Sequence, residues 1–305
     1  MFLPGVVHSF GHAMRQKYGE KVHKLAINAA FTCPNRDGSK GIGGCSFCNN
    51  RSFSPNAKQP PTIKQQICLG KQVVQKRTGA KKYLAYFQAY TNTYAEIGLL
   101  KQNYDKALNE QQVIGLSVGT RPDCVPDAVL ALLADYQQQG HEVWLELGLQ
   151  SAFDESLLKV NRGHGFAEYL DAIKRARHYG IKICTHLIVG LPGETAMQSL
   201  ESHRRVVEAG TDGLKLHPLH VVKGTLLANQ WRRGEYPTLK FNDYISIATG
   251  IIKQTPINII FHRLTATARE DILLAPDWCG KKWLVLNAIH DRLHAEHARQ
   301  GSALH

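Results

Sequence analysis

Short apolar segments alternate with longer amphipathic segments along most of the chain. The short segments are rich in valine, isoleucine and leucine, as expected of strands that are buried on both faces. In the longer segments apolar residues recur every three or four positions, and several of these segments end at glycine, which is typical of helices. The predicted strands are residues 23–31, 82–88, 113–119, 142–149, 181–189, 212–217 and 258–262, and the predicted helices are residues 61–79, 95–109, 126–139, 154–160, 166–179, 195–209, 225–233 and 241–254.

This alternation predicts parallel βαβ units in series, because a crossover helix must join two parallel strands. The chain contains no linker rich in proline or serine and no compositional break. We therefore expect an α/β fold built as a partial (β/α) barrel of about six parallel strands. Its core is expected in residues 23–265, with a short N-terminal extension in residues 1–22 and a helical C-terminal extension in residues 266–305.

Composition and charge narrow the class of protein. The chain has 305 residues, a hydrophobic content of 43% and a formal net charge of +12. Such an excess of positive charge favours an anionic partner, most often a nucleic acid, although some soluble proteins are simply basic. Seven cysteines, an odd number with three clustered, argue against a secreted disulfide framework. No apolar run approaches the roughly 18 residues of a membrane span, so we expect a cytoplasmic protein.

Three cysteines define the strongest motif of the sequence. Cys33, Cys45 and Cys48 follow the first predicted strand with the spacing C-x11-C-x2-C, in a loop that contains four glycines. Three thiolates suit an iron–sulfur cluster with one iron left open, because a closed cluster normally takes four. They also suit a zinc site completed by histidine or water. Reduced thiols without a metal are the third interpretation of the spacing.

Polar residues and glycines gather where the predicted strands end. In a (β/α) barrel the chemistry lies at the carboxyl ends of the strands, so these residues are expected to share one rim. A buried polar residue can also have a purely structural role, and for Glu146 a structural ion pair is the alternative to ligand binding. The candidates are Gln88, Tyr90, Asn92, Thr120, Arg121, Asp123, Glu146, Gln150, Arg162, His164, Gly190, Glu194, Lys215, His217, His220, His262 and Arg263.

Four motifs in this order resemble the radical S-adenosylmethionine (SAM) superfamily. They are the cysteine loop, residues 146–151 with 161–164, residues 188–194, and residues 214–225. The resemblance covers about residues 20–265 and is strongest to the branch that contains the elongator catalytic subunit and its shorter bacterial relatives of the YhcC type. The eleven-residue gap between Cys33 and Cys45 is typical of that branch. The sequence after residue 265 is too short for the acetyltransferase domain of the elongator subunit, so acetyl transfer is not expected.

The resemblance implies a [4Fe–4S] cluster held by Cys33, Cys45 and Cys48, with SAM on the open iron. It also implies reductive cleavage of SAM to a 5′-deoxyadenosyl radical, with the cofactors carrying the bond breaking. By position in the motifs, Phe47 and Gly190 would lie beside the adenine of SAM. The residues implied in contacts to its ribose or carboxylate are Glu146, Gln150, Arg162 and Lys215.

The same resemblance, together with the positive charge, predicts an enzyme that modifies tRNA at the wobble uridine. An electron donor such as flavodoxin or ferredoxin would be a second partner. One alternative is radical chemistry on a small metabolite or a protein, and another is a zinc-stabilised RNA-binding protein without catalysis. Four further cysteines, Cys68, Cys124, Cys184 and Cys279, are scattered, and Cys184 is expected in core packing because it lies within a strand.

Overall fold

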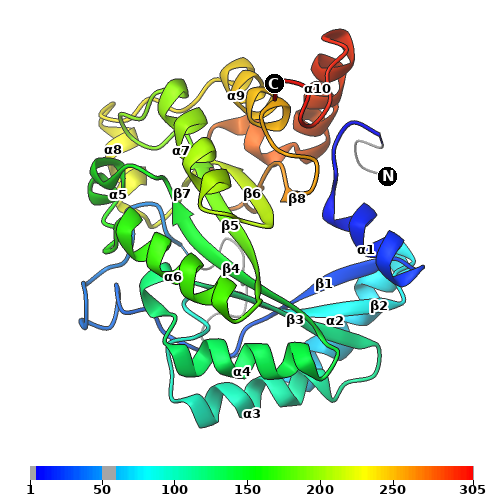
Figure 1. The fold of residues 1–305 in the computed structure, drawn as a ribbon. Coiled ribbons are helices and arrows are strands. Elements are labelled where there is room, and N and C mark those ends of the chain that lie inside the picture. Colours follow the sequence, from blue (N-terminus) through cyan, green and yellow to red (C-terminus); the bar gives the residue numbers. More distant parts are fainter. Residues whose placement is uncertain (1–4, 50–59, 305) are drawn as a thin grey trace.

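Seven parallel strands form one sheet whose strand order follows the chain (Figure 1). The computed structural model describes residues 5–49 and 60–304. The pairing runs β1-β2-β3-β4-β5-β6-β8, and within the described residues the edge strands β1 and β8 do not pair with each other. The predicted partial barrel is therefore confirmed, and the strand expected at residues 258–262 is present as the seventh strand, β8. The strands are β1 Val22–Ile27, β2 Lys82–Phe87, β3 Val113–Thr120, β4 Glu142–Gln150, β5 Lys182–Val189, β6 Gly213–Pro218 and β8 Ile260–Arg263.

Local sequence signals explain why the helices begin and end close to their predicted bounds. Helix α2 begins with a capping box between Thr62 and Gln65 and ends at Gly79, whose φ of +68° suits glycine. A second capping box, Thr195 with Gln198, begins α7. The helices that follow the strands are α2 Ile63–Thr78, α3 Ile97–Leu108, α4 Asp127–Gln138, α5 Asp154–Lys159, α6 Phe166–His178, α7 Ala196–Glu208, α8 Leu226–Arg232 and α9 Phe241–Lys253.

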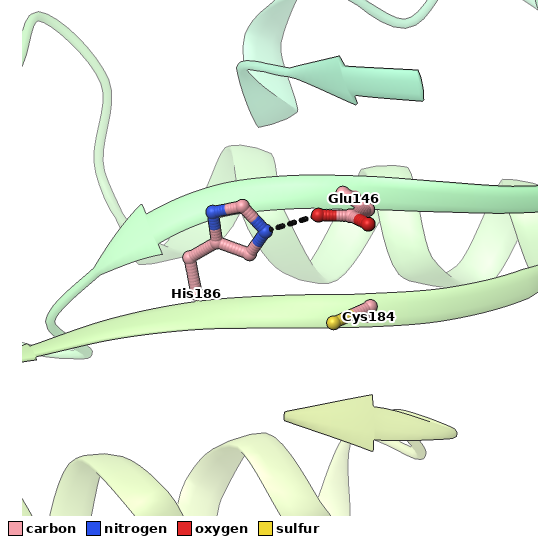
Figure 2. A group of neighbouring side chains, drawn as sticks. All are labelled: Glu146, Cys184 and His186. Atoms are coloured by element: carbon pink, nitrogen blue, oxygen red, sulfur yellow. Dashed lines mark hydrogen bonds and ion pairs between the residues drawn. The ribbon is translucent and has the colours of Figure 1, made fainter. Parts of the chain in front are cut away.

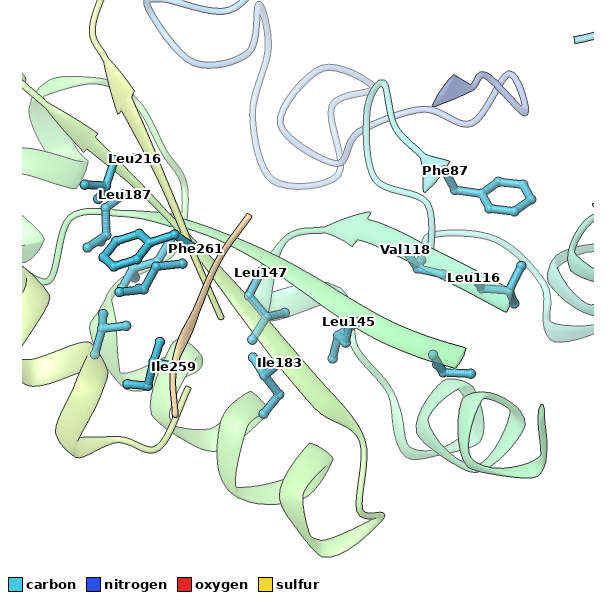
Figure 3. Close-up of a cluster of buried hydrophobic side chains, with 14 of the residues drawn as sticks. Phe87, Leu116, Val118, Leu145, Leu147, Ile183, Leu187, Leu216, Ile259 and Phe261 are labelled. Atoms are coloured by element: carbon cyan, nitrogen blue, oxygen red, sulfur yellow. The ribbon is translucent and has the colours of Figure 1, made fainter. Parts of the chain in front are cut away.

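The outer face of the sheet packs against these helices and forms the main hydrophobic core (Figure 3). Side chains alternate between the two faces of a strand, so the core residues of the strands lie mostly at alternate positions. Leu116, Leu145, Leu147 and Ile183 are fully buried. Burial of each such side chain contributes about 1.5–3 kcal/mol. This layer holds the strands in the register that aligns their carboxyl ends.

The inner face of the barrel changes from apolar to polar along the strands. At the amino ends, Trp144, Leu84 and Cys184 form a separate cluster with Phe10 and Met14 of α1 (Phe10–Tyr18). Helix α1 thus closes the amino end of the barrel. Cys184 is fully buried in this cluster, which confirms the prediction that it packs in the core.

The two terminal segments meet beside the barrel. The amide of Gln300 donates to the carbonyl of Val6 at 2.9 Å, and the His8 amide donates to Oε1 of Gln300 at 2.8 Å. Residues 1–4 of the N-terminal extension lie outside the described residues, and its division from the core stays a prediction. The C-terminal part contains a small antiparallel pair, β7 Val221–Val222 with β9 Leu273–Ala275, and the tail helix α10 Lys282–Ala295. None of the helices that the structure describes has the length and apolar character to cross a membrane.

Candidate functional site

A cavity of about 270 Å³ opens at the carboxyl ends of the strands. The predicted rim is therefore confirmed as the place where the polar residues converge. The cavity also takes in residues that were not predicted, among them Arg36, Tyr86 and His186. The predicted residues that line it are Cys33, Cys45, Phe47, Cys48, Gln88, Tyr90, Thr120, Arg121, Glu146, Gln150, Arg162, His217, His220 and Arg263.

The cysteine loop is shaped by tight backbone turns. The Cys48 amide donates to the Cys45 carbonyl at 3.0 Å, and the Arg36 amide donates to the Cys33 carbonyl at 2.8 Å. Gly44 has a φ of +83°, and a Cβ at this position would lie 2.7 Å from Nε of Arg36. The backbone conformation therefore favours glycine here, and an added Cβ would also force the flexible Arg36 side chain to move.

Contacts to the residues directly after helix α5 and to helix α8 fix this loop over the cavity. The Ser46 amide donates to the Val160 carbonyl at 2.9 Å, and the Leu227 amide donates to the Ser46 carbonyl at 2.9 Å. Nδ2 of Asn161 donates to the Gly44 carbonyl at 2.9 Å. The loop is thus held by segments that follow β4 and β7, far from it in sequence.

Two arginines and one asparagine amide donate to the cysteine loop. Nη1 of Arg162 lies 3.5 Å from Sγ of Cys45, and Nη2 donates to the Gly148 carbonyl at 2.5 Å. Nη2 of Arg36 donates to the Cys48 carbonyl at 2.7 Å. Nδ2 of Asn35 lies 3.8 Å from Sγ of Cys45. Such donors stabilise thiolates and the net negative charge of a cluster with three thiolate ligands.

The spacing of the thiols separates the iron–sulfur from the zinc interpretation. Among the described residues, one trio of histidine, cysteine or acidic side chains brings its ligand atoms within 4.8 Å of one another, and it is Glu146, Cys184 and His186 (Figure 2). The three cysteines of the loop are spread more widely. A single zinc ion with bonds of about 2.3 Å would hold three sulfurs within about 4 Å. Thiolates on separate irons of a cluster are farther apart, so the loop fits the cluster.

Glu146 is the centre of a buried charge network below the cavity. Its Oε1 accepts from Nζ of Lys24 at 2.5 Å and from the Ser117 hydroxyl, and its Oε2 bonds with Nε2 of His186 at 2.7 Å and with Nζ of Lys215 (Figure 2). Burial opposes ionisation of Glu146, but the two lysines hold its pKa well below the usual value. These four partners fill the acceptor sites of both oxygens. The geometry thus supports the structural ion pair, and a SAM contact for Glu146 stays a prediction.

Of the six residues predicted to contact SAM, four line the cavity and two do not. Phe47, Gln150 and Arg162 line the cavity together with Glu146, whereas Gly190 and Lys215 do not. The Gly190 carbonyl accepts from the hydroxyl of Tyr236 at 2.7 Å. The sequence predicts Lys215 and Glu146 at the ends of their strands. In the structure Lys215 lies in the middle of β6 and Glu146 in the middle of β4. The other predicted rim residues outside the lining are Asn92, Asp123, His164, Glu194 and His262.

Backbone conformation marks the lining as a constrained surface. Gln150 has a φ of +83°, and the consecutive residues Ala89 and Tyr90 have φ values of +81° and +63°. Residues other than glycine rarely adopt this region, and where they do the surrounding structure must hold them there. The constraint at Gln150 coincides with a register shift between β4 and β5. Gln150, the last residue of β4, lines the cavity in this conformation.

Sequence reasoning missed the polar residues that lie inside the strands. Lys24, Ser117, Tyr86 and His186 all reach the inner face of the barrel, where Glu146 also points. The signal was a polar residue at alternate positions of otherwise apolar strands. This alternation shows that the inner face of the barrel is polar, but it does not show which of these side chains contact one another.

Comparison with known proteins agrees with this geometry. Residues 32–206 match the family described as the Radical SAM superfamily, and residues 211–295 match the Radical_SAM C-terminal domain. Protein YhcC of Escherichia coli is 50% identical over 304 residues, which cover 100% of this chain and 97% of that protein. The tRNA uridine(34) acetyltransferase of Dehalococcoides mccartyi is 35% identical over 137 residues, or 43% of this chain and 29% of that protein.

A solved structure shares the fold over most of the chain. The archaeal Elp3 of Methanocaldococcus infernus superposes with a TM-score of 0.65 at 19% identity, over 92% of this chain and 64% of that one. The family match covers more than half of the chain and contains all three loop cysteines. The chain therefore belongs to the radical SAM superfamily, and it is an enzyme whose cofactors are a [4Fe–4S] cluster and S-adenosylmethionine.

Proposed function

We propose that this radical SAM enzyme modifies a base in tRNA, at the wobble uridine, in the cytoplasm. The observation that carries the proposal is the similarity to the tRNA uridine(34) acetyltransferase at 35% identity. The charge of the cavity supports it. Of the described residues, four arginines and one acidic residue, Glu146, line the cavity, and the whole chain carries a formal net charge of +12. An RNA substrate would be attracted by both.

The chain's own residues would bind, orient and shield the reacting groups. Cys33, Cys45 and Cys48 would hold the cluster, and Arg162 beside Cys45 would offset negative charge there. When bound, the two cofactors supply one-electron cleavage of the sulfonium bond of SAM, with a flavodoxin or ferredoxin as the electron donor. Phe47 and Tyr86 give the cavity walls apolar surface that excludes water from the reacting atoms.

Nucleoside analysis of tRNA tests the proposal. A deletion strain is complemented with the wild-type gene, with Cys45→Ala, or with Cys68→Ala as the matched control, because the Cys68 thiol is exposed and lies outside the cavity lining. We expect one modified uridine to be absent from the deletion and Cys45→Ala strains, as measured by liquid chromatography and mass spectrometry. It should be restored by the wild type and Cys68→Ala. Identical nucleoside inventories in all strains would refute the tRNA substrate.

A further inference from the structure

We propose that Arg263 and His217 form a subsite that binds an anionic oxygen of the substrate, from a phosphate or a carboxylate group. The inference rests on the proposed function only in that the radical's target must bind in this cavity. His217 belongs to β6, and Arg263 ends the neighbouring strand β8. Both line the cavity that also takes in the three loop cysteines. A group bound to them therefore lies in the same space as the reaction.

Among the residues that the structure describes, Arg263 has no hydrogen-bond or ion-pair partner. Of the other arginines in the lining, Arg121 forms a bidentate pair with Asp123 at 2.9 Å for both bonds. Arg162 and Arg36 are engaged by the cysteine loop. The Arg263 side chain is exposed, and within residues 5–49 and 60–304 it makes no hydrogen bond or ion pair. A planar guanidinium with free donors is suited to phosphate or carboxylate.

The described residues leave an excess of positive charge beneath the subsite. Glu146 is the one acidic residue of the described lining, and Lys24 and Lys215 both pair with it. Two lysines and one carboxylate leave one positive charge, and Arg263 adds a second. A substrate anion would offset this excess, whereas a cationic substrate would increase it.

His217 offers a donor or acceptor that the protein leaves unused. Its Nε2 is buried and has no hydrogen-bond partner among the described residues. The ring stacks against His186, with centroids 5.9 Å apart, and His186 is fixed by its bond to Glu146. Burial and the charge of Arg263 lower the pKa of His217 well below its usual value, so the imidazole is neutral at pH 7. A buried polar atom in this state gains from a ligand that supplies the missing hydrogen bond.

Binding measurements on the reconstituted enzyme with SAM test the subsite. The probes are uridine 5′-monophosphate, uridine and acetate. The variants are Arg263→Gln, Arg263→Lys and the control Arg299→Gln, which removes an exposed arginine of the C-terminal segment outside the cavity lining. If the anion is a phosphate, wild type and Arg299→Gln should bind the monophosphate at least about tenfold more tightly than uridine. If the anion is a carboxylate, both proteins should bind acetate. Arg263→Gln should lose this preference, and Arg263→Lys should keep part of it.

The outcomes separate the sources of the anion and the two proposals. Arg263-dependent binding of the monophosphate indicates a phosphate of a nucleotide, and Arg263-dependent binding of acetate alone indicates a carboxylate substrate. Anion binding that is the same in Arg263→Gln and wild type overturns the subsite, as does a loss of SAM affinity in Arg263→Gln. Unchanged tRNA nucleosides in the deletion strain, with Arg263-dependent anion binding intact, would overturn the tRNA substrate and leave the subsite standing.

Discussion

Removal of the charge on Glu146 should destabilise the protein more than removal of either lysine that pairs with it. The Glu146 side chain is 0% exposed, and those of Lys215 and Lys24 are 4% and 14% exposed. Glu146→Gln leaves two buried cations without a counter-ion, and such a change costs about 3–5 kcal/mol. Lys215→Met leaves Glu146 paired with Lys24, so we expect a cost of about 1–3 kcal/mol from the lost hydrogen bonds.

The pH dependence of the variant follows from the same network. Burial already lowers the pKa of Lys215, and it lowers the pKa of Lys24 to about 8. Without Glu146 both values should fall further, whereas in the unfolded chain they stay near 10.4. The unfolded state then binds more protons, so the stability of Glu146→Gln should rise between pH 7 and pH 9.

Urea unfolding followed by circular dichroism measures both effects. The wild type, Glu146→Gln and Lys215→Met are compared at pH 7 and pH 9. We expect Glu146→Gln to be less stable than Lys215→Met by about 2 kcal/mol at pH 7, and to recover part of this at pH 9. Equal stabilities of the two variants at pH 7, with no recovery at pH 9, would refute the buried charge network.

Two further predictions concern a glycine and a buried acid. An alanine Cβ at Gly115 would lie 1.9 Å from the Glu142 carbonyl oxygen, whereas one at Gly98 in α3 meets nothing within 4 Å. In thermal unfolding, Gly115→Ala should lower the free energy of unfolding by more than about 4 kcal/mol, and Gly98→Ala should raise it by about 0.5–1 kcal/mol. Equal effects of the two substitutions would contradict the close packing of β3 against β4. Burial raises the pKa of Glu194 to about 7, so the folded state binds more protons than the unfolded chain between pH 4.5 and 7. Wild-type stability should therefore decline between pH 4.5 and 7 and level off above pH 7, and Glu194→Gln should remove about 2–3 kcal/mol of this decline. Parallel stability curves of the wild type and Glu194→Gln would contradict this.

The order of the elements could be predicted because local signals mark each boundary. The capping boxes at Thr62 and Thr195 and the positive φ of Gly79 are properties of a few neighbouring residues. The role of the three cysteines could also be predicted, because all three potential ligands lie in one short loop. The pair of β7 and β9 was not predicted, since strands of two and three residues are too short to show a period.

The charge network could not be predicted in the same way. Lys24, Ser117 and His186 meet Glu146 only because four strands, distant in sequence, align in one register. A shift by one residue would turn each of these side chains to the apolar outer face. The alternation of polar residues shows that they face inward, but the sequence does not show which partners meet. For the same reason the sequence does not show that Lys215 lies outside the cavity lining and pairs with Glu146, and its contact with SAM stays a prediction.

Cleavage of SAM by the purified enzyme tests the central claim most directly. The wild type, Cys45→Ala and Cys184→Ala are reconstituted with iron and sulfide without oxygen, reduced, and assayed for 5′-deoxyadenosine. Wild type and Cys184→Ala should form it, because Cys184 packs in the amino-end cluster, and Cys45→Ala should not. A colourless protein with stoichiometric zinc, or equal loss of cleavage from both substitutions, would contradict the assignment of the cluster to the cysteine loop.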